Sequence, residues 1–206
     1  TTGLVAHYTF SGNANDASGN GNNGTVLGPV LTTDRHGNPN QAYSFDGVDD
    51  MIKINDSSSL RPNLITMTAW VNPSEMKRMA IFCKNNSSNA ANEQYTCALE
   101  SNLSTSIYIK QNSSCIAGNG WQQTTTTQAV SFNQWSFVAY TFDGFSLSIF
   151  INGVLVAQKY NLPLNTIDNC VGGALQIGYW WDSYKEAFKG RLDDLRIYNR
   201  DRKSTR

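Results

Sequence analysis

The sequence predicts an all-β protein built from two antiparallel sheets, and three observations support this fold class. The chain holds 23 asparagines and 16 glycines, which favour tight turns, and 11% of its residues are aromatic, which favours strands. Turn signals recur at short intervals along the whole length. No stretch carries the apolar repeat at i, i+3, i+4 and i+7 that an amphipathic helix of three turns needs. We therefore expect strand after strand.

The expected strands begin near the first residues and continue to the end. Residues 4–10 form an apolar run, a long Asn/Gly/Asp loop follows over 11–24, and 65–71 alternates with period two. In 135–160, turn dipeptides that suit a positive φ separate three runs and predict an antiparallel meander. About a dozen such strands make a sandwich or jelly roll. The expected strands cover residues 4–10, 42–45, 51–54, 65–71, 135–142, 145–151, 154–157, 174–178 and 190–198.

The chain is expected to form a single domain over residues 1–200. A chain of 206 residues is long enough to bury a substantial core, and no internal repeat, proline-rich linker or shift in composition divides it. Residues 201–206 are charged and lack apolar side chains, so we expect a frayed tail. The first residue is not methionine and the sequence shows no signal-peptide pattern at its start, which favours a mature or excised segment of a larger protein.

The charge balance excludes two classes of partner. Lys and Arg number 16, as do Asp and Glu, and only 16% of residues are charged. Nucleic acids and anionic membrane surfaces recruit clusters of basic residues, which are missing from this sequence. No apolar run approaches the roughly 20 residues of a membrane span. The sequence therefore predicts neither nucleic-acid binding nor membrane insertion.

Four cysteines indicate the compartment. Cys83, Cys97, Cys115 and Cys170 are even in number and form no Cys-x-x-Cys pair, which makes zinc binding improbable. Two disulfides in an extracellular protein are the expected arrangement, and four buried thiols the alternative. Of the three possible connectivities we expect Cys83 with Cys97, because both lie on short strand-like runs joined by a polar loop. That leaves Cys115 with Cys170.

Several motifs in order carry a family resemblance. The opening GLVAHYTF at 3–10, FDGVDD at 45–50, TMTAWV at 66–71, the meander, and FKGRLDDLRIYNR at 188–200 resemble the laminin G-like branch of the concanavalin A-like lectin and glucanase superfamily. The resemblance implies a concanavalin A-like jelly roll. It also implies a role as a carbohydrate-binding or adhesion module, found in secreted microbial proteins beside catalytic domains. The cysteines, the stretch 85–92 and an aromatic insertion after Gly178 depart from the family pattern.

The sequence does not favour catalysis. Related glucanases place their paired catalytic carboxylates on one strand as Glu-x-Asp-x-Glu, with an optional second residue before the last Glu, because alternate residues share a face. None of the four glutamates, Glu75, Glu93, Glu100 and Glu186, lies in such a pattern. His7 in a strand has no local support for a catalytic triad. The prediction is therefore a chain that is not an enzyme.

Exposed aromatic side chains are the candidates for sugar binding. A pyranose ring stacks its apolar side on a flat aromatic face, while amides and carboxylates bind its hydroxyls. Trp180 and Trp181 are adjacent in a loop insertion, and successive strand residues point to opposite sides, so at least one is expected to be exposed. A core-capping role is the alternative for each. The predicted sugar-binding residues are Trp121, Trp180, Trp181, Asp182 and Tyr184, whereas Trp70 and Trp135 match core positions of the family.

Calcium is the expected cofactor. It takes six to eight oxygen ligands, which Asp and Asn side chains with loop carbonyls supply. The resemblance to glucanases implies a structural calcium held by Asp193 and, more loosely, by the loop of Asp16. The cluster of Asp46, Asp49 and Asp50 is a further candidate. Turn chemistry is the alternative for Asp16 and Asp46, since aspartate caps turns without a metal.

Together these features predict a non-catalytic, extracellular carbohydrate-binding module. Its partner would be an oligosaccharide or polysaccharide, and adjacent domains of a larger secreted protein would accompany it. An adhesion or protein-binding module of the same family is the first alternative, and a glycan-processing enzyme with this fold is the second.

Overall fold

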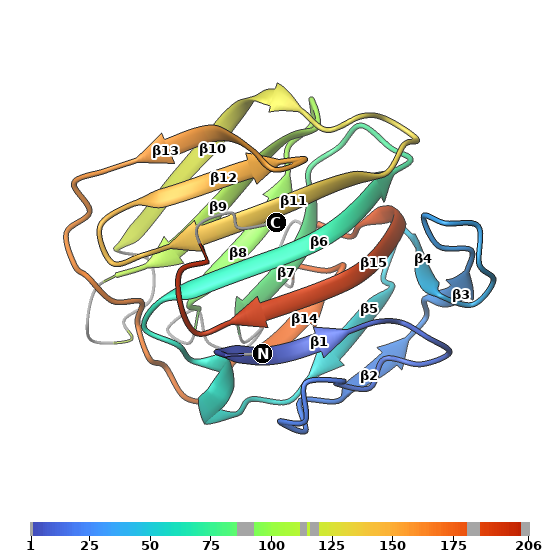
Figure 1. The fold of residues 1–206 in the computed structure, drawn as a ribbon, viewed down its shortest axis with the longest axis horizontal. Coiled ribbons are helices and arrows are strands. Elements are labelled where there is room, and N and C mark those ends of the chain that lie inside the picture. Colours follow the sequence, from blue (N-terminus) through green and yellow to red (C-terminus); the bar gives the residue numbers. More distant parts are fainter. Residues whose placement is uncertain (1, 86–92, 112–114, 116–119, 181–185, 203–206) are drawn as a thin grey trace.

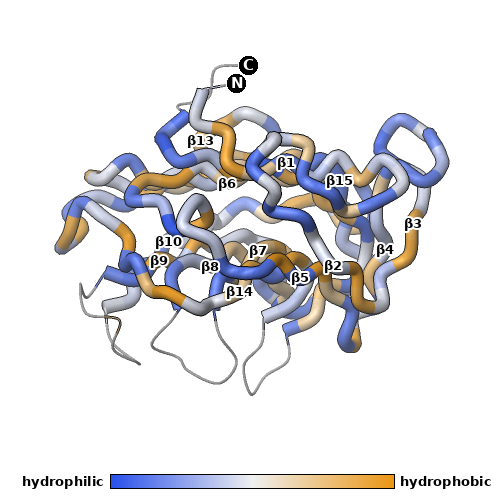
Figure 2. Tube along the Cα trace, turned by 90° about the horizontal axis from the view of Figure 1, so that it is seen from below, coloured by the Kyte–Doolittle hydropathy of each residue, from blue (hydrophilic) through white to orange (hydrophobic). Residues whose placement is uncertain are grey.

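The computed structural model describes residues 2–85, 93–111, 115, 120–180 and 186–202 and forms a sandwich of two antiparallel sheets. Figure 1 shows one sheet in front of the other, and Figure 2 shows the two layers edge-on. A short 3-10 helix, Ser58–Leu60, interrupts the strands. No helix in the described ranges has the length and hydropathy needed to cross a membrane. The predicted all-β, concanavalin A-like jelly roll is confirmed.

We name the front layer sheet A. Among the described residues its strands are β1 (Leu4–Tyr8), β3 (Val30–Thr32), β4 (Ala42–Asp46), β6 (Ile65–Pro73), β11 (Ser136–Phe142), β12 (Leu147–Ile151), β13 (Val154–Lys159) and β15 (Lys189–Tyr198). Their order is β13-β12-β11-β6-β15-β4-β3, and β1 also pairs with β15. β15 pairs along one side with β6 and along the other with β4 and then β1. The expected meander is the β11-β12-β13 end of this sheet.

The rear layer is sheet B. Among the described residues its strands are β2 (Gly24–Leu27), β5 (Met51–Ile54), β7 (Met79–Asn85), β8 (Tyr95–Leu99), β9 (Ser104–Lys110), β10 (Trp121–Ala129) and β14 (Ala174–Ile177). Their order is β10-β9-β8-β7-β14-β5-β2. The sequence did not predict β2, β3, β9 or β10. β2 and β3 are short and partly exposed, and β10 is an edge strand of Thr and Gln without apolar alternation.

The core fills the space between the sheets. In β6, Ile65, Met67, Ala69 and Val71 are fully buried in the main apolar cluster, as the period-two pattern predicts. Intervening residues of β6 therefore lie on the outer face of sheet A. The same alternation in β9 directs Ile107 and its alternate neighbours inward and leaves polar side chains on the outer face of sheet B.

One predicted disulfide is confirmed and the other is wrong. Cys115 and Cys170 are bonded across 55 residues of sequence, whereas Cys83 and Cys97 are buried thiols that form no disulfide. The physical reason is strand register. Cys97 lies opposite Phe82, so it shares the core face with Phe82, while Cys83 is one residue further and points to the outer face. Two side chains on opposite faces of a sheet cannot be bridged.

Candidate functional site

The aromatic insertion after Gly178 is only partly described. Trp180 is described, whereas Trp181, Asp182 and Tyr184, the other predicted sugar ligands of this run, lie outside the described residues. Tyr179 is 5% exposed and packs in a small cluster with Met51 and Ala187. Trp180 is half-buried, and its indole Nε1 is buried without a hydrogen-bond partner in the described structure.

Trp180 belongs to an aromatic cluster that also contains Tyr108 and Arg78. The Trp180 and Tyr108 ring centroids lie 5.9 Å apart at an angle of 57°. The Arg78 guanidinium lies 4.8 Å from the Trp180 ring centre and 5.4 Å from that of Tyr108. Cation–π attraction fixes the two rings relative to the arginine. We call these three residues the aromatic cluster.

Two glutamates contact the arginine of the aromatic cluster. Arg78 Nη1 donates to Glu186 Oε1 at 2.8 Å, and its Nε lies 3.3 Å from Glu100 Oε2. Glu100 Oε1 also accepts hydrogen bonds from Ser106 Oγ at 2.6 Å and Tyr108 Oη at 3.0 Å. With one guanidinium against two carboxylates, these side chains carry a net charge of −1.

The titrating groups of the cluster stay in their ordinary charge states at neutral pH. Burial raises the pKa of Tyr108, and the negative charge of Glu100 adds to the effect, so its hydroxyl stays protonated and can donate. Burial opposes the charge on Arg78, but Glu186 and Glu100 outweigh it and raise its pKa. The aromatic cluster therefore offers two aromatic rings, the hydroxyl of Tyr108 and the guanidinium of Arg78, with the carboxylate oxygens of Glu100 and Glu186 beside them.

Strand register places Trp121 on the same face as the cluster. Tyr108 lies opposite Gln123, and Trp121 lies opposite Lys110, two residues further along β9. Trp121 and Tyr108 thus both point to the outer face of sheet B. Trp121 is half-buried, and among the described residues no ring contact joins it to the cluster. Two predicted aromatic residues, Trp121 and Trp180, therefore share a face.

Gln176 adds an amide to this face. It lies on β14 opposite Cys83, is 4% exposed and donates from Nε2 to Asn85 Oδ1 at 3.3 Å. Its Oε1 is buried without a partner in the described structure. An unpaired buried acceptor is costly, and bound ligands or water commonly satisfy such groups.

Sequence reasoning missed Arg78, Glu100 and Tyr108 as site residues. A signal for Tyr108 was present, because residues 104–110 alternate between polar and apolar side chains and put Tyr108 on the polar face with Ser106. No comparable signal existed for Arg78 or Glu100. Both lie at strand ends, and only the fold brings them to Tyr108.

Asp16 organises the first loop. Its Oδ1 accepts from the backbone N–H of His7 at 2.9 Å and of Ser18 at 2.8 Å. Its Oδ2 accepts from Ser18 Oγ at 2.8 Å and the Asn22 N–H at 3.0 Å. Partial burial alone would raise the pKa of Asp16, but these hydrogen bonds outweigh it and lower the pKa. Four donors occupy the oxygens that a calcium ion would need, so Asp16 does not fit the expected site.

Asp193 does not fit calcium either. It is 2% exposed, and its Oδ2 forms an ion pair with Arg35 Nη1. Arg35 also lies over the Trp70 ring at 5.1 Å, and its Nη2 is 3.5 Å from Asp194 Oδ2. Burial raises the pKa of Asp193 despite the attraction of Arg35. The guanidinium thus supplies the positive charge at Asp193 that the family resemblance assigned to a metal.

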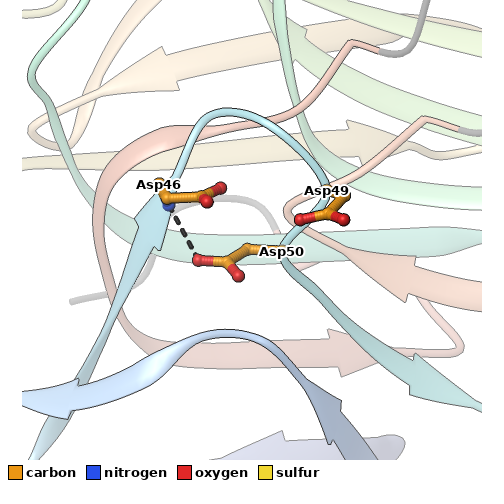
Figure 3. Close-up of side chains that lie close together, drawn as sticks. All are labelled: Asp46, Asp49 and Asp50. Atoms are coloured by element: carbon orange, nitrogen blue, oxygen red, sulfur yellow. Dashed lines mark hydrogen bonds between the residues drawn. The ribbon is translucent and has the colours of Figure 1, made fainter.

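The third acidic candidate lies between β4 and β5. Figure 3 shows Asp46, Asp49 and Asp50 together, and ligand atoms of these three carboxylates lie within 4.8 Å of one another. Asp50 Oδ2 accepts from the Asp46 N–H at 2.8 Å, and Asp46 Oδ1 accepts from the Val48 N–H at 2.8 Å. These are the hydrogen bonds of a tight turn. We assign no metal to this cluster.

The prediction that Trp70 and Trp135 are core residues is wrong. Trp70 lies between Ala69 and Val71, which are fully buried, so its ring is on the outer face of sheet A. Trp135 is half-buried and lies beneath the Arg191 guanidinium at 5.3 Å. The sequence correctly placed Trp70 in a strand, but it assigned the side chain to the inner face of the sheet instead of the outer face.

The two antiparallel sheets make this chain an all-β protein of the concanavalin A-like jelly-roll type. A family model described as the concanavalin A-like lectin/glucanases superfamily matches residues 46–206. The chain belongs to this superfamily. A comparison with curated protein sequences gives no match.

Several solved structures share the fold. Domain 4 of AbnA, a GH43 extracellular arabinanase from Geobacillus stearothermophilus in complex with arabinotriose, is 23% identical with a TM-score of 0.71, over 95% of this chain and 91% of that one. The SAP-like pentraxin of Limulus polyphemus is 16% identical with a TM-score of 0.58, over 77% and 76%. The botulinum neurotoxin serotype D ligand binding domain in complex with N-acetylneuraminic acid is 14% identical with a TM-score of 0.68, over 97% and 48%.

Proposed function

We propose that this chain is a non-catalytic carbohydrate-binding module of an extracellular protein, and that it binds an oligosaccharide or polysaccharide on the outer face of sheet B. The observation that carries the proposal is the aromatic cluster, in which Trp180 and Tyr108 are held by Arg78 beside carboxylate oxygens. Superfamily membership is consistent with this role. Two structures of the same fold were determined with arabinotriose or N-acetylneuraminic acid present, which adds support.

The chemistry of the face suits a polyhydroxyl ligand. Sugar rings pack an apolar side against an aromatic ring, and their hydroxyls both donate and accept hydrogen bonds. Glu100 supplies acceptor oxygens, Tyr108 a hydroxyl and Gln176 an amide oxygen without a partner in the described structure. Trp121 on the same face would extend the platform along a longer chain of sugars.

The net charge of −1 favours neutral sugars. Arg78 is already paired with Glu100 and Glu186, so it offers little attraction to an acidic sugar. A carboxylate brought into this partly buried face would meet like charge, which disfavours binding. We therefore propose a neutral glycan as the ligand of sheet B.

The same ion pairs argue for binding without hydrolysis. A glycosidase needs one protonated carboxylic acid and one carboxylate across the scissile bond. Arg78 contacts both Glu100 and Glu186, so both carboxylates are held in ion pairs and neither is free to reach a leaving-group oxygen. Neither glutamate is thus suited to act as the general acid.

A glycan array tests the proposal. The purified domain is expected to bind one class of neutral glycans, and Trp180→Ala and Tyr108→Ala are each expected to abolish that signal. Trp135→Ala is the matched control, because Trp135 is a half-buried tryptophan beneath an arginine elsewhere in the molecule. Unchanged array binding by a folded Trp180→Ala variant would refute the site, and sugar products released from a polysaccharide would refute the non-catalytic role.

A further inference from the structure

A pocket lies on the side of the molecule opposite the aromatic cluster, on the outer face of sheet A. Its volume of about 460 Å³ is in the range of small-molecule sites. The register of the strands explains its shape. Thr68 and Ala139 lie opposite each other and form a low floor, because both side chains are small. Two residues further along these strands, Trp70 lies opposite Phe137. On the neighbouring strand β12, Phe150 lies opposite Ala139.

The aromatic walls of this pocket are held in place. The Trp70 and Phe137 ring centroids are 5.4 Å apart at an angle of 52°. Arg35 lies 5.1 Å from the Trp70 ring centre, and its guanidinium is anchored by Asp193. The Phe137 N–H donates to Asn152 Oδ1 at 2.8 Å, which brings an amide to the pocket. A rigid wall loses little conformational entropy when a ring packs against it.

The chain after β15 closes one side of the pocket. Thr66 Oγ1 donates to the Arg200 carbonyl at 2.8 Å and accepts from the Arg202 N–H at 2.9 Å. Figure 1 shows the described chain turning back from β15 towards β6. The Arg202 guanidinium lies over the Tyr198 ring at 4.4 Å, and both residues line the pocket.

The net charge of the pocket lining is opposite to that of Arg78, Glu100 and Glu186 around the aromatic cluster of sheet B. Its lining contains the cations Arg196 and Arg202 and the anion Asp194, a net charge of +1. The Asp194 carboxylate already contacts three nitrogen atoms: Arg196 Nη2 at 3.0 Å, His7 Nε2 at 2.9 Å and Arg35 Nη2 at 3.5 Å. In the described structure, no carboxylate forms an ion pair with Arg202. Arg202 is therefore the cation available to a ligand.

We infer that the pocket on sheet A binds a single ring that carries an anionic group, of the size and chemistry of an acidic sugar residue. The ring packs against Trp70 and Phe137, and the anionic group pairs with Arg202. The Thr68 hydroxyl and the Asn152 amide bind its remaining polar groups. This site is separate from the neutral-glycan site proposed for sheet B, and it has the opposite preference for charge.

Paired probes test the charge preference. Methyl β-D-glucuronide and methyl β-D-glucoside differ in one carboxylate, and benzoate provides the same charge on an aromatic ring. Titration followed by two-dimensional NMR is expected to show tighter binding of the glucuronide than of the glucoside by roughly five-fold, as one partly exposed ion pair would give. Benzoate that binds better than the glucuronide would assign the pocket to aromatic acids and overturn the sugar assignment.

Variants separate this site from sheet B. Arg202→Gln, a change outside the strands, is expected to remove the preference of the pocket for the glucuronide, and Trp70→Ala to remove the chemical-shift changes of the sheet A residues with both sugars. Trp180→Ala should leave the chemical-shift changes of the sheet A residues unchanged with both sugars, since Trp180 packs on Tyr108 of the other sheet. Equal binding of the two sugars by the natural chain would overturn the proposal for the sheet A pocket. Chemical-shift changes confined to residues of sheet B would also overturn it, whatever the glycan array shows.

Discussion

Asp194 combines an unusual backbone conformation with a network of charges. Its φ is +49°, and the register of β15 shifts between Asp193 and Arg196. Aspartate and asparagine tolerate this region better than most residues. Burial acts to raise its pKa, but the hydrogen bond from His7 and the charges of Arg196 and Arg35 outweigh it and lower the pKa. The bulge thus directs an ionised carboxylate to the sheet surface.

The lowered pKa of Asp194 predicts a pH-dependent contribution to stability. A carboxyl group with a depressed folded-state pKa stabilises the fold above its unfolded pKa of about 3.9, and this is lost as pH falls through the folded value. Asp194→Asn should reduce the free energy of unfolding by about 1–3 kcal/mol at pH 7 and by much less near pH 2. Urea unfolding at both pH values measures this. An equal loss at both would contradict the assignment.

Cys83 and Cys97 give a second residue-scale prediction. Both thiols are fully buried, and burial raises the pKa of Cys97 well above its usual value, so neither should react in the native protein. Titration with a thiol reagent in strong denaturant, without reductant, should detect two thiols. Four thiols would mean that Cys115 and Cys170 are not bonded, and none would restore the pairing of Cys83 with Cys97.

At the scale of elements, Arg35 joins the loop after β3 to β15 and β6. It pairs with Asp193 on β15 and lies over Trp70 on β6. Arg35→Met should destabilise the protein by about 3–5 kcal/mol, because the buried carboxylate loses its partner. The double variant Arg35→Met, Asp193→Asn should recover much of this loss in a urea unfolding experiment. No recovery would show that Arg35 acts through packing on Trp70 instead.

The same ion pair changes the expectation for calcium. Because Arg35 neutralises Asp193 and four donors occupy Asp16, the structure predicts an unchanged melting temperature when calcium is replaced by a chelator. A lower melting temperature in chelator would contradict this. Asp46→Asn and Asp50→Asn would then be the first variants to examine, since those carboxylates lie close together.

At the scale of the whole molecule, alternation and turn chemistry were sufficient for the fold class. The inward residues of β6 and the meander of β11 to β13 follow from period-two patterns and Asp-Gly or Asn-Gly turns. The edge strand β10 escaped prediction, because strand pairing rather than an apolar face holds its Thr and Gln residues in the sheet.

The site was harder to predict than the fold. Trp121 and Trp180 were predicted as sugar ligands from loop context; Trp121 is the first residue of β10, and Trp180 packs on Tyr108 of the same sheet. Trp70 was assigned to the wrong side of its strand, since a large aromatic residue suits either face of a sandwich sheet. Arg78 and Glu100 join the cluster through contacts between strand ends that no local pattern encodes.

The two proposed sites therefore differ in charge as well as in position. The side chains that hold Trp180 and Tyr108 carry a net charge of −1, and the lining of the pocket at Trp70 and Phe137 carries a net charge of +1. A thin two-layer fold can carry a separate site on each outer face, because the core between the sheets keeps the two faces apart.

The central claim is that sheet B is the glycan-binding face, and one calorimetric comparison tests it. The best neutral oligosaccharide from the array is titrated into the natural domain, Trp180→Ala and Trp70→Ala. Loss of a central aromatic contact is expected to weaken binding by about ten-fold or more in Trp180→Ala, while Trp70→Ala binds as the natural chain does. Full affinity in Trp180→Ala with loss in Trp70→Ala would contradict the claim and move the glycan to sheet A.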